Sequence, residues 1–368
     1  MNYSTTINLQ KSFFREKEKV LILNESMSAS TFIFESGVYG LRIKNKCGEI
    51  VMLPYQGQQV WSCNFHGREL AMRSAFTEPV LTSEYLKTYG GFLLHCGATA
   101  MGVPAKGDHH PLHGDLPNAP YQRAFIETGK DNKGNFIALG GQYHHIVSFN
   151  HNYLAEPMVK LYEDSTVIDV SMKITNLKNT DMELMYLMHV NFRPVDNGVL
   201  VYSANCNPND VRVHAETPTH IKTGPNVGKL SEFLNLLVDH PEHHNVLKPE
   251  LVFDPEILFT IKYKTDENGY AHSMQVHPDD FASYISHRTS ELDYGLRWIA
   301  RTKNEDALGI VLPATAEHKG YSAEKEKGHI KNISAGKTVE FKVQAGLLIP
   351  SEAEKMKAKI NSILEDKK

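Results

Sequence analysis

The feature that most constrains the fold is a rhythm of short apolar runs separated by turn residues. Most runs are bounded by Gly, Asn or Pro, which is typical of β-strands joined by turns. The run at 166–176 alternates apolar and polar residues, which predicts a strand with one packed and one solvated face. The runs cover 20–23, 30–35, 38–43, 50–53, 56–61, 66–70, 92–97, 121–128, 136–139, 142–149, 158–163, 166–176, 184–192, 250–253, 258–264, 269–277, 292–301, 308–312 and 338–348.

Helices of regular length do not alternate with these strands, which disfavours a parallel βαβ fold. Many strands with few helices predict an all-β protein built as a large antiparallel sandwich. A chain of 368 residues is long for one domain, but large β folds run long as single units, and composition shifts nowhere. We therefore expect one β-sandwich domain over residues 25–350, preceded by an N-terminal arm at 1–24.

Helical signals are few and lie mainly at the ends of the chain. The first 20 residues are polar and charged, and we expect a short helix or an irregular arm there. Residues 231–239 have a helix-like pattern. Ser351 and Glu354 have the spacing of a capping box, which predicts a C-terminal helix over 351–368 packed on a sheet edge.

Composition narrows the partners and the cellular setting. The net charge of −4 provides no basic surplus for phosphate backbones, so nucleic acid is not expected as a partner. No window approaches ~18 consecutive apolar residues, so no membrane span is expected. The 4 cysteines have no CxxC spacing, which favours free thiols and a cytoplasmic location. The sequence does not indicate the oligomeric state.

Several common catalytic signatures are missing from the sequence. No Gly-x-Gly-x-x-Gly follows a strand, and no Walker-type lysine loop is present. No Gly-x-Ser-x-Gly elbow is present either. Nucleotide cofactors and serine-hydrolase chemistry therefore lose most of their support.

The loop at 110–122 is dense in groups that do chemistry or fix the backbone. Its prolines exclude a helix, and it carries His110, His113 and Asp115. A rigid loop with imidazole and carboxylate groups is a common way for a β-scaffold to present a site. His113 is our first candidate there, against the alternative of an ordinary turn.

Two strand ends supply further candidates. An apolar strand over 184–188 leads directly into His189, whose imidazole can exchange a proton near neutral pH. The alternative is a core histidine held by a backbone carbonyl. A later buried strand ends at Pro313 and leads to Glu317 and His318. Glu317 could equally be a solvated loop carboxylate.

The order of these motifs resembles the aldose 1-epimerase (galactose mutarotase-like) superfamily over roughly residues 25–348, and most of all its uncharacterised bacterial branch. The motifs are Leu112-His113-Gly114, the strand leading to His189-x-Asn191-Phe192, and Pro313-Ala314-Thr315. The resemblance implies a β-supersandwich with a sugar pocket and no metal or organic cofactor. It implies that His113 holds the sugar ring near O5 and that His189 is the general acid. The implied reaction interconverts anomers or epimers of a small-molecule carbohydrate.

The sequence departs from this family at the position of the general base. The resembling branch has a Glu directly before Pro-Ala-Thr, and this chain has Leu312. Leucine cannot take a proton, so Glu317, Asp279 or His318 would have to substitute. We name Glu317 as the third catalytic candidate. Weaker candidates for contacts with the sugar are Asp115, Gln122, Asn191, Arg193, Arg68 and Arg73, the last two for a carboxylate or phosphate group.

Two other functions remain open from the sequence. One is a metal-dependent sugar isomerase or epimerase, because neutral imidazoles bind transition metals and the chain has 19 histidines. The other is sugar binding without catalysis, because the usual base is replaced. The histidines that could converge are His109, His110, His113, His144, His145 and His189. The aromatic residues that could stack on a sugar are Trp61, Tyr89, Phe92, Tyr121 and Trp298.

Overall fold

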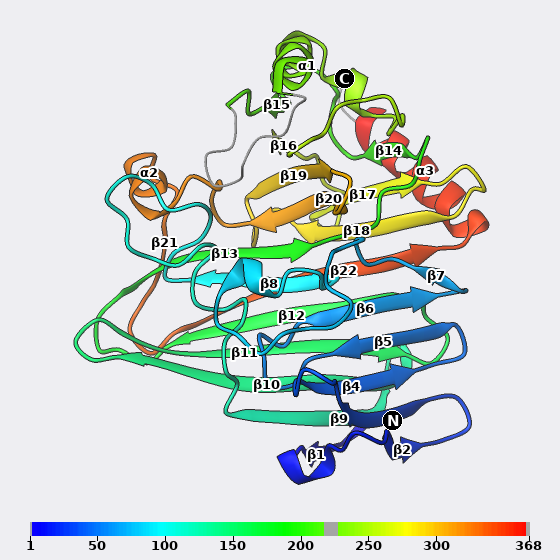
Figure 1. Cartoon of the computed structure of the whole chain (residues 1–368), viewed down its shortest axis with the longest axis vertical. Coiled ribbons are helices and arrows are strands. Elements are labelled where there is room, and N and C mark those ends of the chain that lie inside the picture. The colour runs from blue at the N-terminus through cyan, green and yellow to red at the C-terminus, as the bar shows by residue number, and fades with distance from the viewer. Residues whose placement is uncertain (1, 217–226, 366–368) are drawn as a thin grey trace.

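The computed structural model describes residues 2–216 and 227–365. Its strands form two large antiparallel sheets (Figure 1). The first sheet has nine strands, in the order β1 (Tyr3–Asn8), β9 (Arg123–Asp131), β10 (Gly134–Val147), β11 (His151–Tyr162), β12 (Val167–Asn176), β22 (Thr338–Leu348), β18 (Ala282–Arg288), β17 (Tyr270–Val276) and β14 (Val199–Tyr202).

The second sheet has thirteen strands. Eleven follow the order β15 (Val211–Val213), β16 (Ile257–Ile261), β19 (Tyr294–Arg301), β20 (Asp306–Ala314), β13 (Met182–Val190), β8 (Leu93–Ala98), β6 (Val60–Phe65), β5 (Gly48–Met52), β4 (Tyr39–Lys44), β3 (Ser28–Ile33) and β2 (Lys19–Leu23). Two more pair at its side, namely β21 (Lys331–Ile333) with β13 and β7 (Arg68–Glu69) with β6.

Helices are few and lie outside the two sheets. The α-helices are α1 (Val227–Asp239), α2 (Tyr321–Glu326) and α3 (Pro350–Glu365). The 3-10 helices are η1 (Lys11–Phe13), η2 (Tyr85–Lys87) and η3 (Pro241–His244). The expected C-terminal helix is confirmed as α3, which buries Ala353 and Ile360 and lies beside β14 and β22 (Figure 1).

Strand β13 shows how the sheets divide their two faces. Leu184, Tyr186 and Met188 belong to the main core, where the Tyr186 ring stacks on Phe341 of the opposite sheet at 4.7 Å between centroids. Met185 and Leu187 belong to a second, smaller cluster on the other face of the strand. Because side chains alternate along a strand, His189 points to the same face as Leu187. This outer face of the thirteen-stranded sheet carries the site.

The expected all-β sandwich with a C-terminal helix is confirmed, and the structure differs from two local expectations. The first 20 residues do contain a short helix, η1, but residues 3–8 form strand β1, which pairs with β9 along the sheet edge. Its side chains are mostly exposed, so no apolar period marks it. Residues 250–253 are not a strand, because Pro249 and Pro255 flank them and lack the N–H groups that a ladder needs.

Two further features bear on the expectations from composition. Within the described residues, no helix is both long and apolar enough to cross a membrane. Cys47, Cys63, Cys96 and Cys206 are all free thiols, as the sequence predicted.

Candidate functional site

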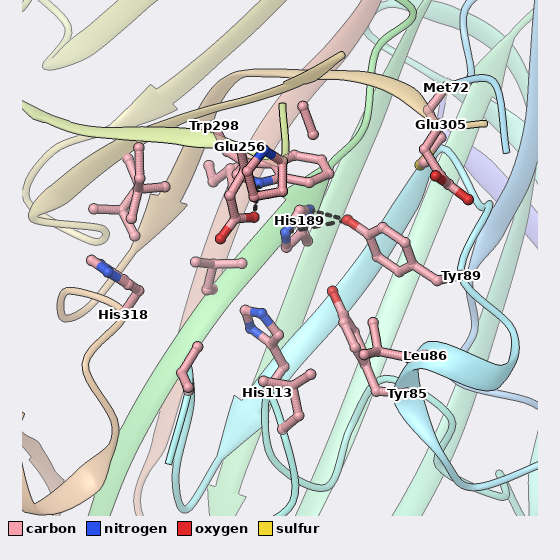
Figure 2. A pocket seen from close by; sticks show the side chains of 18 of the residues that line it. Met72, Tyr85, Leu86, Tyr89, His113, His189, Glu256, Trp298, Glu305 and His318 are labelled. Carbon is pink, nitrogen blue, oxygen red and sulfur yellow. Dashed lines mark hydrogen bonds between the residues drawn. The ribbon is translucent and has the colours of Figure 1, made fainter. Parts of the chain in front are cut away.

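A cavity of about 420 Å³ opens on the outer face of the thirteen-stranded sheet, over β13, β19 and β20. We call it the aromatic chamber (Figure 2). His113 and His189 both line it, and so does Leu312, the position at which the resembling family has its base. Its lining residues are Met72, Phe76, Tyr85, Leu86, Tyr89, Val103, Leu112, His113, Leu187, His189, Pro255, Glu256, Leu258, Leu296, Trp298, Ala300, Thr302, Glu305, Leu312 and His318.

His113 reaches this chamber from the long loop between β8 and β9. The loop is fixed to β8 by hydrogen bonds from the Gly97 N–H to the His113 carbonyl at 2.9 Å and from the Asp115 N–H to the Gly97 carbonyl at 2.6 Å. Gly114 is required at the next position, because its φ is +82° and a Cβ there would lie 2.2 Å from the Ala100 carbonyl oxygen. His113 itself has a φ of 60°, so the turn that presents it is tightly constrained.

His189 is held in one orientation by its neighbours. Its Nδ1 lies 2.6 Å from Oδ1 of Asn191, and the Asn191 amide donates to the Gly91 carbonyl at 3.0 Å. Because the side-chain nitrogen of Asn191 donates to Gly91, the side-chain oxygen of Asn191 faces His189 and accepts a hydrogen bond from its protonated Nδ1. The Nε2 atom of His189 is therefore the nitrogen that exchanges a proton. Burial lowers the pKa of His189 to about 4, against the raising effect of the Asn191 hydrogen bond.

Aromatic side chains form the wall around the two histidines. The rings of His113 and His189 are 5.5 Å apart between centroids, and Trp298 lies 5.3 Å from His189. Tyr85 lies 4.8 Å from His113. The Tyr89 hydroxyl donates to Asn191 at 3.2 Å, and burial raises its pKa, so it stays a neutral donor. A chamber with apolar walls and a few converging polar groups is the usual form of a small-molecule site.

Glu256 is the chamber's carboxylate beside these rings, and the sequence reasoning missed it. Its Oε2 accepts a hydrogen bond from the Trp298 indole N–H at 2.6 Å (Figure 2). The residue precedes β16, where Leu258 pairs with Trp298 of β19. Glu256 is two residues before Leu258, so in an extended chain both side chains face the same side. The pairing of β16 with β19 thus delivers the carboxylate, and no local sequence signal reveals that pairing.

A second cavity of about 630 Å³ adjoins the first, and we call it the charged chamber. The two chambers share Val103, Glu256, Leu258 and His318, so they lie side by side. The charged chamber is lined by Val103, Pro104, Ala105, Lys106, Arg212, His214, Glu216, Glu256, Leu258, Glu317, His318, Lys319, Ala323 and Lys327.

Glu317, the predicted substitute base, lines the charged chamber rather than the aromatic one. Its carboxylate accepts hydrogen bonds from Thr260 at 2.7 Å, from Lys327 at 2.9 Å and from Arg212. Although burial opposes ionisation, these donors lower the pKa of Glu317 to about 2. A carboxylate so fully engaged is a poor proton acceptor.

The remaining predicted contact residues do not line either chamber. Asn191 acts behind His189, as described above. Asp115 accepts from the Thr99 hydroxyl at 3.1 Å, and Gln122 accepts from the His144 N–H at 2.8 Å.

The three predicted arginines also have partners outside both chambers. Arg193 donates to the Ala71 carbonyl at 3.1 Å. Arg73 donates to backbone carbonyls of the loop after β19. Arg68 forms an ion pair with Asp279, which accounts for that alternative base as well.

The histidine cluster required by the metal-dependent alternative does not assemble. Among the residues that the structure describes, the only group with metal-ligand spacing is Glu317, Glu324 and His329, and it contains none of the six predicted histidines. The Lys327 ammonium lies 2.9 Å from a carboxylate oxygen of Glu317 and of Glu324. It thus supplies the positive charge that a metal ion would bring.

Comparison with solved structures defines the class of fold. The chain is similar over its whole length to a Klebsiella pneumoniae protein provisionally assigned as an aldose 1-epimerase, with a TM-score of 0.81, 17% identity and 97% of that chain covered. A galactose mutarotase-like protein from Lactobacillus casei matches 84% of this chain and 100% of its own, with a TM-score of 0.54 and 14% identity. The chain therefore has the galactose mutarotase-like fold, as the resemblance implied.

The sequence family is narrower than this fold class. The model of the family described as "Domain of unknown function (DUF4432)" matches residues 35–222, just over half of the chain. The chain belongs to this family. No curated protein matches the chain in sequence.

Proposed function

We propose that the aromatic chamber binds a sugar ring and that the protein interconverts the anomers of that sugar. The observation that carries the proposal is the convergence of His113, His189 and Glu256 on one cavity beside Trp298. Two imidazoles and a carboxylate supply groups that accept and donate protons. The aromatic rings supply an apolar wall for the ring carbons of a sugar.

The proposed reaction moves one proton onto the ring oxygen and one off the anomeric hydroxyl. Glu256 takes the O1 proton, and His189 delivers a proton to O5 while the C1–O5 bond breaks. The open-chain aldehyde rotates about C1–C2, and ring closure from the other face returns both protons. His113 would lie at the ring oxygen and orient it. Each proton-transfer group of this kind typically contributes about 10²–10⁴-fold in rate.

Glu256 thereby takes over the role that the family assigns to the position of Leu312. Glu256 and Leu312 line the same chamber, so a base at Glu256 can reach the same ligand from a different segment of the chain. Glu317 is less suited, because it lines the charged chamber and not the aromatic one.

His189 must gain a proton before it can act as the acid. Burial keeps its imidazole neutral at neutral pH. A bound sugar excludes water and leaves the Glu256 carboxylate as a nearby negative charge, which favours the imidazolium. The reaction requires only one proton on this pair, which His189 carries while Glu256 is ionised.

The proposal is tested by exchange NMR of anomeric protons with neutral, acidic and phosphorylated sugars. The protein should accelerate exchange for at least one sugar, and His189→Gln should reduce that acceleration by about 10²-fold or more. Glu305→Gln is a matched control, because Glu305 lines the chamber on the side away from Trp298 (Figure 2). Unchanged exchange in His189→Gln would overturn the assignment of His189.

A further inference from the structure

The cationic side chains of the charged chamber have no part in the proton transfers proposed above, yet this chamber adjoins the space where they occur. Glu256 and His318 line both chambers, so a substituent on a ring in the aromatic chamber can lie close to the charged one. The aromatic chamber alone, at about 420 Å³, already falls within the usual size of small-molecule sites. The further volume of about 630 Å³ therefore needs a separate explanation.

Four cationic side chains from separate segments line the charged chamber. Lys106 comes from the loop after β8, Arg212 from β15, Lys319 from the loop after β20, and Lys327 from the end of α2. Positive side chains that converge from four separate segments create a positive potential in the chamber, and this potential favours the binding of an anion.

Three carboxylates, those of Glu216, Glu256 and Glu317, line the charged chamber beside its four cations, so its lining side chains carry one excess positive charge. Glu317 is 4% exposed and already accepts from Arg212, Lys327 and Thr260. Glu216 pairs with Lys319, but its side chain is 79% exposed, so this ion pair is weak and open to exchange. A ligand anion can displace Glu216 from Lys319 without uncovering a buried charge.

The two imidazoles of the charged chamber add neutral polar groups. His214 and His318 lie 4.7 Å apart between ring centroids, and the His214 Nε2 contacts the Thr260 hydroxyl at 2.8 Å. Burial first, and nearby cations second, lower the pKa of His214 to about 4. Neutral imidazoles provide hydrogen bonds to an anion.

We propose that the charged chamber binds an anionic substituent, such as a phosphate, sulfonate or carboxylate group, on the sugar whose ring occupies the aromatic chamber. This inference rests on the proposed sugar site. Lys106, Lys319 and Arg212 are the groups that recognise the anion. Arg68 and Arg73, the candidates from the sequence, have partners elsewhere. The natural substrate is then an anionic sugar rather than a neutral hexose.

The first test measures orthophosphate binding by NMR titration, which needs no catalysis. The wild-type protein should bind orthophosphate saturably, and Lys106→Gln/Lys319→Gln should weaken binding about tenfold, as expected for removing two partly exposed charges. The control, Lys44→Gln/Lys173→Gln, removes two half-exposed lysines of β4 and β12 that line neither chamber, and it should bind as the wild type does. No saturable binding, or equal binding by the wild type and Lys106→Gln/Lys319→Gln, overturns the inference.

The second test compares anomer exchange of glucose, glucose 6-phosphate and glucuronate. We expect kcat/KM to favour an anionic sugar over glucose, and this preference should fall about tenfold in Lys106→Gln/Lys319→Gln. The phosphate and carboxylate arms show which anion fits. A preference that both proteins share equally overturns the inference. If no sugar is exchanged but orthophosphate binds as expected, the proposed reaction fails and the anion site stands.

Discussion

Asn191 governs how the imidazole of His189 meets the aromatic chamber. Its side chain is fully buried, and it holds Nδ1 from behind while its own amide is fixed by the Gly91 carbonyl. It does not line the chamber, so it is a positioning residue. Such support decides which nitrogen exchanges protons and how readily it does so.

Replacing Asn191 by Asp should raise the pKa of His189. A carboxylate at the place of an amide oxygen 2.6 Å from Nδ1 favours the imidazolium, by roughly 1–3 pKa units for an opposite charge this close. The measurement is an NMR titration of the His189 ring in both proteins, with circular dichroism to verify folding. A His189 pKa that stays near 4 in the variant would show that Asn191 does not control it.

The pH dependence of kcat/KM follows from the same residue. His189 must be protonated in order to donate, and burial lowers its pKa to about 4, so the competent fraction of free protein falls as pH rises. We expect kcat/KM to decrease from about pH 5 to pH 8, and kcat to decrease at higher pH because Glu256 favours the imidazolium in the complex. A kcat/KM that rises over this range would mean that neutral His189 acts as the base.

One of the contacts that fix helix α2 to the sheet runs through Lys327, the charged residue that follows the helix. Glu324 on the helix and Glu317 after β20 are both buried, and the Lys327 ammonium bridges them. His329 also contacts Glu324 at 2.7 Å. Buried carboxylates are tolerated only while such partners remain.

Lys327→Met should therefore destabilise the protein strongly. It leaves two buried carboxylates short of a cation, which costs about 2–4 kcal/mol in the free energy of unfolding after allowing for the partial exposure of Lys327. Lys325→Met is the control on α2, because Lys325 is half-exposed and pairs with Glu183 at the surface, and it should change stability by at most ~0.5 kcal/mol. Urea unfolding measures both, and equal losses would refute the bridging role.

The elements themselves could largely be predicted from the sequence, and their pairing could not. The strand that ends at His189 follows directly from its apolar run, whereas the face that His189 occupies became clear only from the packing of its neighbours. The loop that presents His113 was recognisable from its prolines and Gly114. Glu256 was missed because its position depends on the register between β16 and β19, which the local pattern does not specify.

The whole molecule buries several histidines in neutral form. Burial lowers the pKa of His95 and His287 to about 3 and that of His189 and His277 to about 4, against about 6.5 in an unfolded chain. Between the folded and the unfolded pKa values of these histidines, the folded state therefore binds fewer protons than the unfolded state. Its stability is fully present above about pH 6.5 and decreases as pH falls toward the folded pKa values.

This difference predicts early acid destabilisation. Each such histidine contributes a slope of up to about 1.4 kcal/mol per pH unit in the window below pH 6.5, where most carboxylates are still ionised. The urea midpoint should be clearly lower at about pH 5 than at about pH 7.5. A midpoint that is equal or higher at the lower pH would contradict neutral burial of these side chains.

For the whole molecule, the two chambers explain how a fold shared with mutarotase-like proteins can carry a site without a carboxylate at the position of Leu312. The aromatic chamber keeps both predicted histidines, and the carboxylate enters from β16 instead of the position of Leu312. The charged chamber draws on segments between Lys106 and Lys327 that lie far apart in the sequence and meet only in the folded protein. Sequence reasoning singled out His113 and His189, which the structure places in one cavity, whereas the carboxylate of Glu256 was found only from the tertiary structure.

The most direct test of the proton-transfer pair is the anomer exchange rate of Glu256→Gln measured by NMR beside Glu305→Gln. Both substitutions remove one carboxylate that lines the aromatic chamber, and only Glu256 bonds to Trp298. The proposed mechanism predicts that Glu256→Gln loses about 10²–10⁴-fold of the acceleration while Glu305→Gln changes it only slightly. Equal exchange in Glu256→Gln and the wild-type protein would contradict the central role of Glu256.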